Sequence, residues 1–108
     1  MADCIFCKIA KKEIASQILF EDSRVVAFPD INPVSPVHFL VIPKRHVEGI
    51  LELNSEELTS IQAAIKIISS LCRDGFRVVN NFGKDGGQEV PHVHFHVLAG
   101  RKHSWPPG

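Results

Sequence analysis

The chain is 108 residues long; 44% of its residues are hydrophobic, 22% are charged, and the formal net charge is zero. This length predicts a single domain over residues 1–108, and no apolar run approaches the roughly 18 residues that a membrane helix needs. Because the basic and acidic residues cancel without forming a basic stripe, the composition excludes a typical nucleic-acid binder and a membrane protein, and it favours a small ligand as partner.

The amino-terminal stretch MADCIFCKIAKK shows neither a secretion signal nor a myristoylation site, so we expect a cytoplasmic location. A short helix is expected over residues 4–12. Cys4 and Cys7 would lie one turn apart on it, a spacing that suits metal chelation, whereas the odd total of three cysteines argues against a disulfide framework. A thioredoxin-like pair is disfavoured because no strand precedes it, and a pair of unliganded thiols stays open.

Three extended segments follow this helix. QILFE (17–21) and RVVAF (24–28) are separated by two residues that suit a hairpin turn. HFLVIP (38–43) predicts a third strand, after a turn that begins at Asp30. The short connections favour antiparallel pairing of these strands.

A long helix is expected from Asn54, which can cap it, with Glu57 at the reciprocal position of a capping box. One apolar stripe with helical spacing would face the sheet, and it comprises Leu58, Ile61, Ile65, Ile68 and Cys72. FRVVNNF (76–82) and HVHFHVLA (92–99) predict two more strands. The elements together predict an α+β fold: an antiparallel meander of about five strands with the long helix on one face.

Histidine occupies every second position at the start of the last expected strand. Side chains alternate across a strand, so the histidines share one face and the residues between them share the other, where the long helix can bury them. The histidine face would then be open to a ligand, and its strict period disfavours a solvated face that uses histidine by chance. Neutral imidazole is a nucleophile, a proton carrier and a metal ligand, so this face indicates chemistry on an anionic or metallic group.

The stretch His92-Val-His94-Phe-His96-Val-Leu resembles the His-φ-His-φ-His-φ-φ motif of the histidine triad (HIT) family, in which φ is hydrophobic. IFCKIAKKEI, VVAFPDINPVSPVHFLVIPKRH and GGQEVPHVHFHVLAGR extend the resemblance over nearly the whole chain, and the ending WPPG is similar to that of the Hint branch, the nucleoside phosphoramidases. The resemblance implies one HIT domain that hydrolyses purine nucleoside 5′-phosphoramidates, cleaving the P–N bond and releasing AMP.

The resemblance also implies a role for each nearby histidine. His94 would attack the α-phosphorus, His96 would contact the phosphate and the leaving group, and His38 would join a hydrogen-bond relay with the nucleophile. Water would then release a nucleoside monophosphate from nucleotidylated His94. On the residues alone, His38 is also explained as a polar residue that starts a strand.

The glycine-rich segment NNFGKDGGQEV (80–90) lacks the GK[ST] ending of a P-loop, so it predicts no triphosphate site of that kind. The resemblance implies that Asn81, Gly87 and Gln88 contact phosphate or ribose. Glu89 stands where well-studied animal members carry a serine that hydrogen-bonds the leaving group. We therefore hypothesise that Glu89 favours a cationic amine as the leaving group.

The expected nucleoside site combines one acidic residue with apolar ones. The resemblance implies that Asp30 accepts hydrogen bonds from both ribose hydroxyls and that apolar side chains enclose the base; the candidates are Phe6, Ile14, Phe28 and Ile31. Taken alone, Asp30 is a turn former and the apolar residues are ordinary core. In the Hint branch two chains form a homodimer, and Trp105 would reach toward the partner's site; alternatively it packs at a stiff tail.

Many bacterial HIT proteins hold zinc, and the residues that match their ligands here are Cys4, Cys7, His46 and His92. A Cys₂His₂ set fills all four tetrahedral positions with protein atoms and leaves none for an activated water. The zinc would therefore be structural.

The triad alone does not define the reaction. A dinucleoside polyphosphate hydrolase and a nucleotide-binding or scaffolding module with incidental turnover both stay open, whereas zinc-dependent nucleic-acid binding is disfavoured by the zero net charge. We expect a purine nucleotide as substrate and a homodimer as the assembly.

Overall fold

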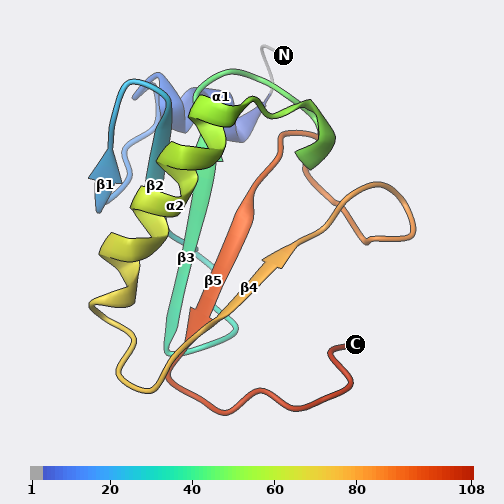
Figure 1. The fold of residues 1–108 in the computed structure, drawn as a ribbon. Helices are drawn as coiled ribbons and strands as arrows, with labels where there is room; N and C mark the ends of the chain where they lie inside the picture. The colour runs from blue at the N-terminus through green and yellow to red at the C-terminus, as the bar shows by residue number, and fades with distance from the viewer. Residues whose placement is uncertain (1–3) are drawn as a thin grey trace.

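The structure, a computed structural model, describes residues 4–108, which form an antiparallel sheet of five strands with a helix on each face (Figure 1). In chain order the elements are α1 (Ile5–Ala10), β1 (Phe20–Glu21), β2 (Val25–Pro29), β3 (Val37–Pro43), the 3₁₀ turn η1 (Ile50–Glu52), α2 (Ser55–Ser69), β4 (Arg77–Asn80) and β5 (Phe95–Ala99). This architecture confirms the expected α+β class with one long and one short helix. Within residues 4–108, no helix has the length and apolar character needed to cross a membrane.

The sheet is covered on both faces at β2. Val25 and Ala27 pack in the cluster that contains α2, whereas Val26 and Phe28 pack in the cluster that contains α1. Figure 1 shows α2 lying across one face of the sheet. Because both faces are buried, β2 is a continuous apolar run and does not alternate between apolar and polar residues.

α2 begins with the predicted capping box. The Asn54 side chain accepts a hydrogen bond from the Glu57 N–H at 2.8 Å, and the Glu57 carboxylate accepts one from the Asn54 N–H at 3.0 Å. The predicted apolar stripe is wrong at its first position, because Leu58 is 47% exposed whereas Glu57 is buried. Glu57 can face inward because Arg45 donates to both of its carboxylate oxygens, at 2.8 and 2.9 Å. An ion pair thus replaces the leucine contact that hydropathy predicts.

The strand order is β1-β2-β3-β5-β4, so the predicted meander is wrong in its last two strands. A meander pairs β3 with β4, but here β3 pairs with β5, and Leu40 lies opposite His96. β4 then pairs with the other edge of β5. The reason is the connection between β3 and β4: it contains α2, and a connection of that length lets β4 skip the neighbouring position. The histidine strand therefore lies inside the sheet, fixed along both edges.

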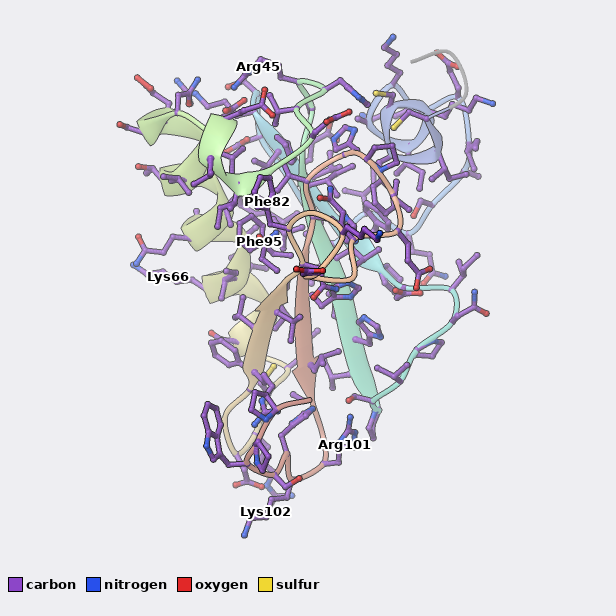
Figure 2. All side chains as sticks on the ribbon, turned by 90° about the vertical axis from the view of Figure 1, so that its right-hand side faces the viewer. Arg45, Lys66, Phe82, Phe95, Arg101 and Lys102 are labelled. Atoms are coloured by element: carbon purple, nitrogen blue, oxygen red, sulfur yellow. The ribbon has the colours of Figure 1, made fainter. Side chains whose placement is uncertain are left out.

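β5 begins only at Phe95, so His92 and His94 lie in the irregular stretch just before it. Side chains still alternate there, because Val93 and Phe95 both pack in the α2 cluster; Figure 2 shows Phe95 on the α2 side of the sheet. The histidine face is not open along its whole length, contrary to our expectation. His92 is fully buried, since the ring of Phe6 in α1 packs edge-on against it with the ring centroids 5.8 Å apart.

Candidate active site and metal centre

Four metal-ligand candidates converge from three separate segments. Cys4 and Cys7 lie at the start of α1, His46 follows β3, and His92 precedes β5. Their ligand atoms all lie within 4.8 Å of one another, and the Cys7 Sγ is 3.1 Å from the His46 Nδ1. The structure therefore brings together the four residues that the family resemblance implied.

The tautomer of His92 suits a metal ligand. Its Nε2 lies 2.8 Å from the Pro43 carbonyl oxygen, which only accepts, so Nε2 carries the proton and Nδ1 has the lone pair. Nδ1 faces the two cysteines, 3.4 Å from the Cys4 Sγ and 3.6 Å from the Cys7 Sγ. Burial lowers the pKa of the His92 ring, which keeps it in the neutral form that a ligand needs.

The cysteines complete a donor set that fits zinc. Burial, and next the neighbouring Cys4 side chain, raise the pKa of the Cys7 thiol, so a thiolate there needs a cation beside it. Two thiols and two imidazoles within this distance match a tetrahedral Cys₂His₂ site, and such a site is structural because protein atoms fill every position. The cluster is compatible with zinc, which would link α1 to the histidine strand.

A cavity of about 660 Å³ lies over the histidine face, between α1, the chain after β2 and the glycine-rich loop. This volume is within the range of pockets that enclose a small-molecule ligand. Most of the predicted site residues line it, namely Phe6, Ile14, Phe28, Asp30, Ile31, His38, Asn81, Gly87, Glu89, His94 and His96. The sequence-based assignment of these residues to one site therefore agrees with the geometry.

The apolar part of the cavity pairs a buried wall with an exposed rim. Phe28 is 3% exposed and its ring centroid is 6.1 Å from that of Phe6, whereas Ile31 is 91% exposed. Core packing accounts for the two phenylalanines but not for Ile31. A flat apolar ligand in the cavity would cover Ile31 and remove this surface from water.

The tautomer of His94 is set by a main-chain hydrogen bond. Its Nδ1 lies 2.8 Å from the carbonyl oxygen of His92, so Nδ1 donates its proton there and the neutral ring keeps a lone pair on Nε2. The ring of Phe6 packs against it with the centroids 4.9 Å apart. His94 is only 7% exposed, but it lines the cavity. Its lone pair is therefore available to an electrophile that is bound in the cavity.

A hydrogen-bond relay leads from the main chain to His96. The Val34 N–H donates to the His38 Nδ1 at 3.1 Å, so the neutral His38 ring carries its proton on Nε2. That Nε2 lies 2.9 Å from the His96 Nδ1, which therefore accepts, and the neutral His96 ring presents Nε2–H as a donor. The Asp30 carboxylate lies 3.4 Å from the His38 Nε2.

Burial keeps both rings of the relay neutral. It lowers the pKa of His38, although the charge of Asp30 opposes the change. It also lowers the pKa of His96 to about 4, and the neighbouring His94 and His38 act in the same direction. At neutral pH the relay thus holds uncharged imidazoles with defined donors and acceptors.

Asp30, His38 and His96 also place ligand atoms within 4.8 Å of one another, as a metal site would. Their hydrogen bonds argue against a metal. A cation on the His38 Nε2 would require the ring proton on Nδ1, where it would face the Val34 N–H, donor against donor. Hydrogen bonding between neutral rings explains this cluster better.

Two of the predicted nucleotide-binding residues do not line the cavity. The Gln88 amide closes the loop instead: its oxygen accepts from the Gly83 N–H at 3.0 Å, and its nitrogen donates to the carbonyl oxygens of Glu48 at 2.6 Å and Val90 at 3.1 Å. Trp105 is 82% exposed in the carboxy-terminal tail. Gln88 therefore acts on the shape of the loop, and Trp105 is outside the site of its own chain.

Some residues of the cavity were not predicted from the sequence. Leu40 lies two positions after His38 in β3, so the period of a strand could have placed it on the same face. Val34 contributes a main-chain N–H, for which the residue type carries no signal. Leu98, two positions after His96, was available from the same alternation.

Fold and site together define an α+β protein whose histidine strand closes a ligand-sized apolar cavity and also anchors a Cys₂His₂ cluster. The HIT domain model matches residues 11–103, and the chain belongs to the HIT domain family.

Solved structures of the family match nearly the whole chain. A HIT family hydrolase from Legionella pneumophila Philadelphia 1 superposes with a TM-score of 0.90 at 45% identity, covering 98% of this chain and 100% of that one. A histidine triad protein from Clostridium difficile gives a TM-score of 0.85 at 48% identity, with 94% of both chains covered. The 14 kDa zinc-binding protein of Zea mays is 44% identical over 112 residues, covering 96% of this chain and 87% of that protein.

Proposed function

We propose that this protein hydrolyses purine nucleoside 5′-phosphoramidates through a nucleotidyl-histidine intermediate on His94. One observation carries the proposal: the rings of His94 and His96 both line the cavity with their centroids 5.1 Å apart, and their hydrogen bonds leave a lone pair on the His94 Nε2 and a proton on the His96 Nε2. A nucleophile next to a hydrogen-bond donor suits attack on a phosphorus whose oxygens the donor holds. The hydrolases among the structural neighbours support the reaction class.

The cavity orients the substrate in this proposal. The base lies between the phenylalanine wall and Ile31, and Asp30 accepts hydrogen bonds from the ribose hydroxyls. The Asp30 carboxylate is held in one orientation, because its Oδ1 accepts a hydrogen bond from the Asn32 N–H at 2.8 Å. The phosphate then lies over His94 and His96, with its oxygens toward the Nε2–H of His96.

The chemical step starts from the form of the phosphoramidate that is protonated on nitrogen. The His94 lone pair forms a bond to phosphorus, the P–N bond to the leaving group breaks, and its electron pair leaves with a neutral amine. The ring becomes an imidazolium, and its Nδ1–H donates to the carbonyl oxygen of His92, which stabilises that charge. Water then attacks phosphorus, the nucleoside monophosphate leaves, His94 regains its lone pair, and one proton is released.

The test is turnover with two substrate classes. Purified protein and its His94→Ala variant are incubated with adenosine 5′-phosphoramidate and with diadenosine polyphosphates, and AMP release is followed. We expect release from the phosphoramidate alone, reduced by orders of magnitude in the variant. Preferential cleavage of the dinucleotides would indicate a polyphosphate hydrolase, and AMP binding without turnover would indicate a binding or scaffolding module.

Glu89 bears on the leaving group. It lines the cavity, where a carboxylate repels a second phosphate and favours a cationic amine. This charge preference supports a phosphoramidate over a dinucleoside polyphosphate. Kinetics of Glu89→Ser with a lysyl and a simple amide adduct test it, and an unchanged preference would contradict it.

We also propose that the Cys₂His₂ cluster binds structural zinc and that the protein is cytoplasmic, where reducing conditions keep such thiols free for the metal. The ligand geometry described above supports the zinc. The zinc-binding relative from Zea mays gives independent support.

The assembly we propose is a homodimer formed through β4 and the neighbouring end of α2. Val79 lines the cavity, so Val78 faces the α2 side, where it is 41% exposed at the edge of the sheet (Figure 1). Three further apolar residues are exposed in this region, namely Ile67, Leu71 and Phe76. A second sheet edge would cover them. Sedimentation should show a dimer that Val78→Asp dissociates, whereas Leu51→Asp, on η1, leaves it intact.

A further inference from the structure

The segment before β3 is fixed to the chain after β5 by one arginine. The Arg101 Nε donates to the Ser35 Oγ at 3.0 Å and to the Val34 carbonyl oxygen at 3.2 Å. Figure 2 shows Arg101 beside the lower end of β3, whereas the neighbouring Lys102 extends away from the sheet. Arg101 thus connects two segments that are 66 positions apart or more in the sequence.

The same two segments are also in close steric contact. Gly100 has a φ of +90°, and a Cβ there would lie 2.7 Å from the Pro36 Cβ. Glycine is therefore required for both its conformation and its lack of a side chain. Because Ser35 is only 7% exposed, the segment is packed as well as hydrogen-bonded.

The position of the segment before β3 affects His38, because this segment supplies the Val34 N–H. That donor lies 3.1 Å from the His38 Nδ1 and keeps the proton off this nitrogen, and the Asp30 carboxylate, 3.4 Å from Nε2, favours the proton there. His38 in turn decides the tautomer of His96, through the contact of 2.9 Å between their rings. A small displacement of Val34 would remove the group that keeps the proton off Nδ1, so that both tautomers of His38 become populated.

The two possible tautomers have opposite consequences for a bound phosphate. With the proton on Nδ1, the His38 Nε2 would present a lone pair to His96, and His96 would have to turn its own proton toward it. The His96 Nε2 would then present a lone pair to the phosphate oxygens, which repel it. The donor that holds the phosphate would be lost without any change in His96 itself.

We infer that Arg101 is a positioning residue that acts through the Val34 main chain to hold His38 and His96 in the tautomers in which His96 presents an N–H to the ligand. The Nε of Arg101 donates to Ser35 and Val34, so its effect on the two histidines is indirect. For catalysis the inference rests on the proposed function, but the tautomers themselves do not depend on it.

The direct test is nitrogen NMR of the histidine rings in the ligand-free protein, which distinguishes protonated from unprotonated ring nitrogens. In the parent chain we expect His38 and His96 each to carry the proton on Nε2. Arg101→Gln should give a mixture of tautomers at both rings, and Ser35→Ala a smaller change, because Arg101 keeps its bond to Val34. Lys102→Gln removes a positive charge at the neighbouring position and should leave the tautomers of both rings as they are in the parent.

Kinetics give a second readout that a purely structural role would not move. Arg101→Gln should lower kcat by about 10-fold, a fraction of the loss seen when an oxyanion donor is removed outright, while KM stays within about 3-fold. Arg101→Lys should restore part of kcat, because an ammonium group can still donate to the Val34 carbonyl oxygen.

Parent-like tautomers in folded Arg101→Gln would overturn the inference, whatever the activity. If the parent shows no phosphoramidase turnover but its tautomers change in Arg101→Gln, the proposed function fails and the positioning role stands. Thermal unfolding of each variant identifies those that have lost the fold, and Ser35→Ala then serves as the milder substitute.

Discussion

The ring Nδ1 of His94 lies 2.8 Å from the main-chain oxygen of His92, and the ring of His92 belongs to the Cys₂His₂ cluster. One residue therefore serves both sites: its side chain faces the cysteines and its carbonyl group orients the ring of His94, the proposed nucleophile. Phe6, between Cys4 and Cys7 in sequence, packs against both rings. A metal bound by the cluster would hold the ring of His94 in place without touching a ligand in the cavity.

The first prediction concerns removal of the metal. Cys4→Ser/Cys7→Ser should abolish stoichiometric zinc and lower the melting temperature by about 10–20 °C, because a ligand present at about 100 times its Kd stabilises by about 2.7 kcal/mol. Turnover should fall less than in His94→Ala, since the nucleophile remains. Elemental analysis and calorimetry measure the first two quantities.

Cys72→Ser is the matched control for this experiment. Cys72 is half-buried next to α2, and its Sγ donates a hydrogen bond to the Ile68 carbonyl oxygen at 3.4 Å. This variant should keep its zinc. A parent protein without stoichiometric zinc, or equal loss in both variants, would contradict a structural Cys₂His₂ site.

The second prediction concerns the ribose. Asp30→Asn keeps the oxygen that accepts a hydrogen bond from the Asn32 N–H. It replaces the second, negatively charged oxygen, which would accept hydrogen bonds from the sugar hydroxyls, with an amide group. Because hydrogen bonds to a charged group contribute about 1.5–3 kcal/mol, kcat/KM for adenosine 5′-phosphoramidate should fall by about 10–100-fold. The measurement is steady-state kinetics on parent and variant.

A substrate without ribose hydroxyls provides the comparison for Asp30. The 2′,3′-dideoxy analogue should be hydrolysed equally by the parent and Asp30→Asn, since neither can use the missing hydroxyls. If the variant loses the same factor with both substrates, Asp30 acts through His38, 3.4 Å away, and not through the sugar.

Much of the site could be predicted because it depends on local periodicity and on residue type. Alternation placed Val93 and Phe95 toward α2, and the capping pattern placed the start of α2 at Asn54 and Glu57. These features are encoded by neighbours in the sequence. The histidine motif is likewise contained in one short stretch.

What could not be predicted depends on contacts between distant segments. The position of β5 between β3 and β4 could not be predicted, because the connection through α2 is long enough to permit more than one strand order. The buried Glu57 depends on Arg45, and the inward turn of the Gln88 amide depends on the Glu48 carbonyl group. The tautomer of His38 depends on a main-chain N–H that any residue other than proline would supply.

The third prediction concerns the ion pair beneath α2. Arg45, labelled in Figure 2, binds both oxygens of Glu57, whose side chain is 5% exposed, and these bonds lower the pKa of that carboxyl group. Arg45→Met keeps the aliphatic part but leaves the carboxylate unpaired, so the free energy of unfolding should fall by about 1–3 kcal/mol. Urea denaturation measures it.

A double variant distinguishes loss of the pair from loss of packing. Arg45→Met/Glu57→Gln removes the buried charge as well, while glutamine can still complete the capping box. It should be closer to the parent in stability than Arg45→Met alone. If the double variant is less stable than the parent by the sum of the losses in Arg45→Met and Glu57→Gln, the two side chains do not interact energetically.

The fourth prediction concerns stability at acid pH. The pKa of His96 is lowered to about 4 in the folded chain from an ordinary value of 6.5, mainly by burial. Between these two values the unfolded ring binds a proton and the folded ring does not, so unfolding takes up a proton. The contribution of His96 to stability is therefore complete above about pH 6.5, decreases as the pH falls, and is lost below about pH 4, with a slope of at most about 1.4 kcal/mol per pH unit.

His96→Gln isolates this contribution, because the remaining acid-sensitive groups, including the Cys₂His₂ cluster, are common to both proteins. Burial also lowers the pKa of His38, so the parent should show a slope in the same direction from that residue, and the variant should retain part of it. Urea denaturation between about pH 4 and 6.5 gives the free energy of unfolding at each pH, and its slope gives the number of protons taken up on unfolding. This number should be smaller in the variant by up to about one proton. If the two proteins lose stability in parallel over this range, the folded His96 ring is not held neutral, and the relay would have to operate with a charged imidazole in place of the neutral donor.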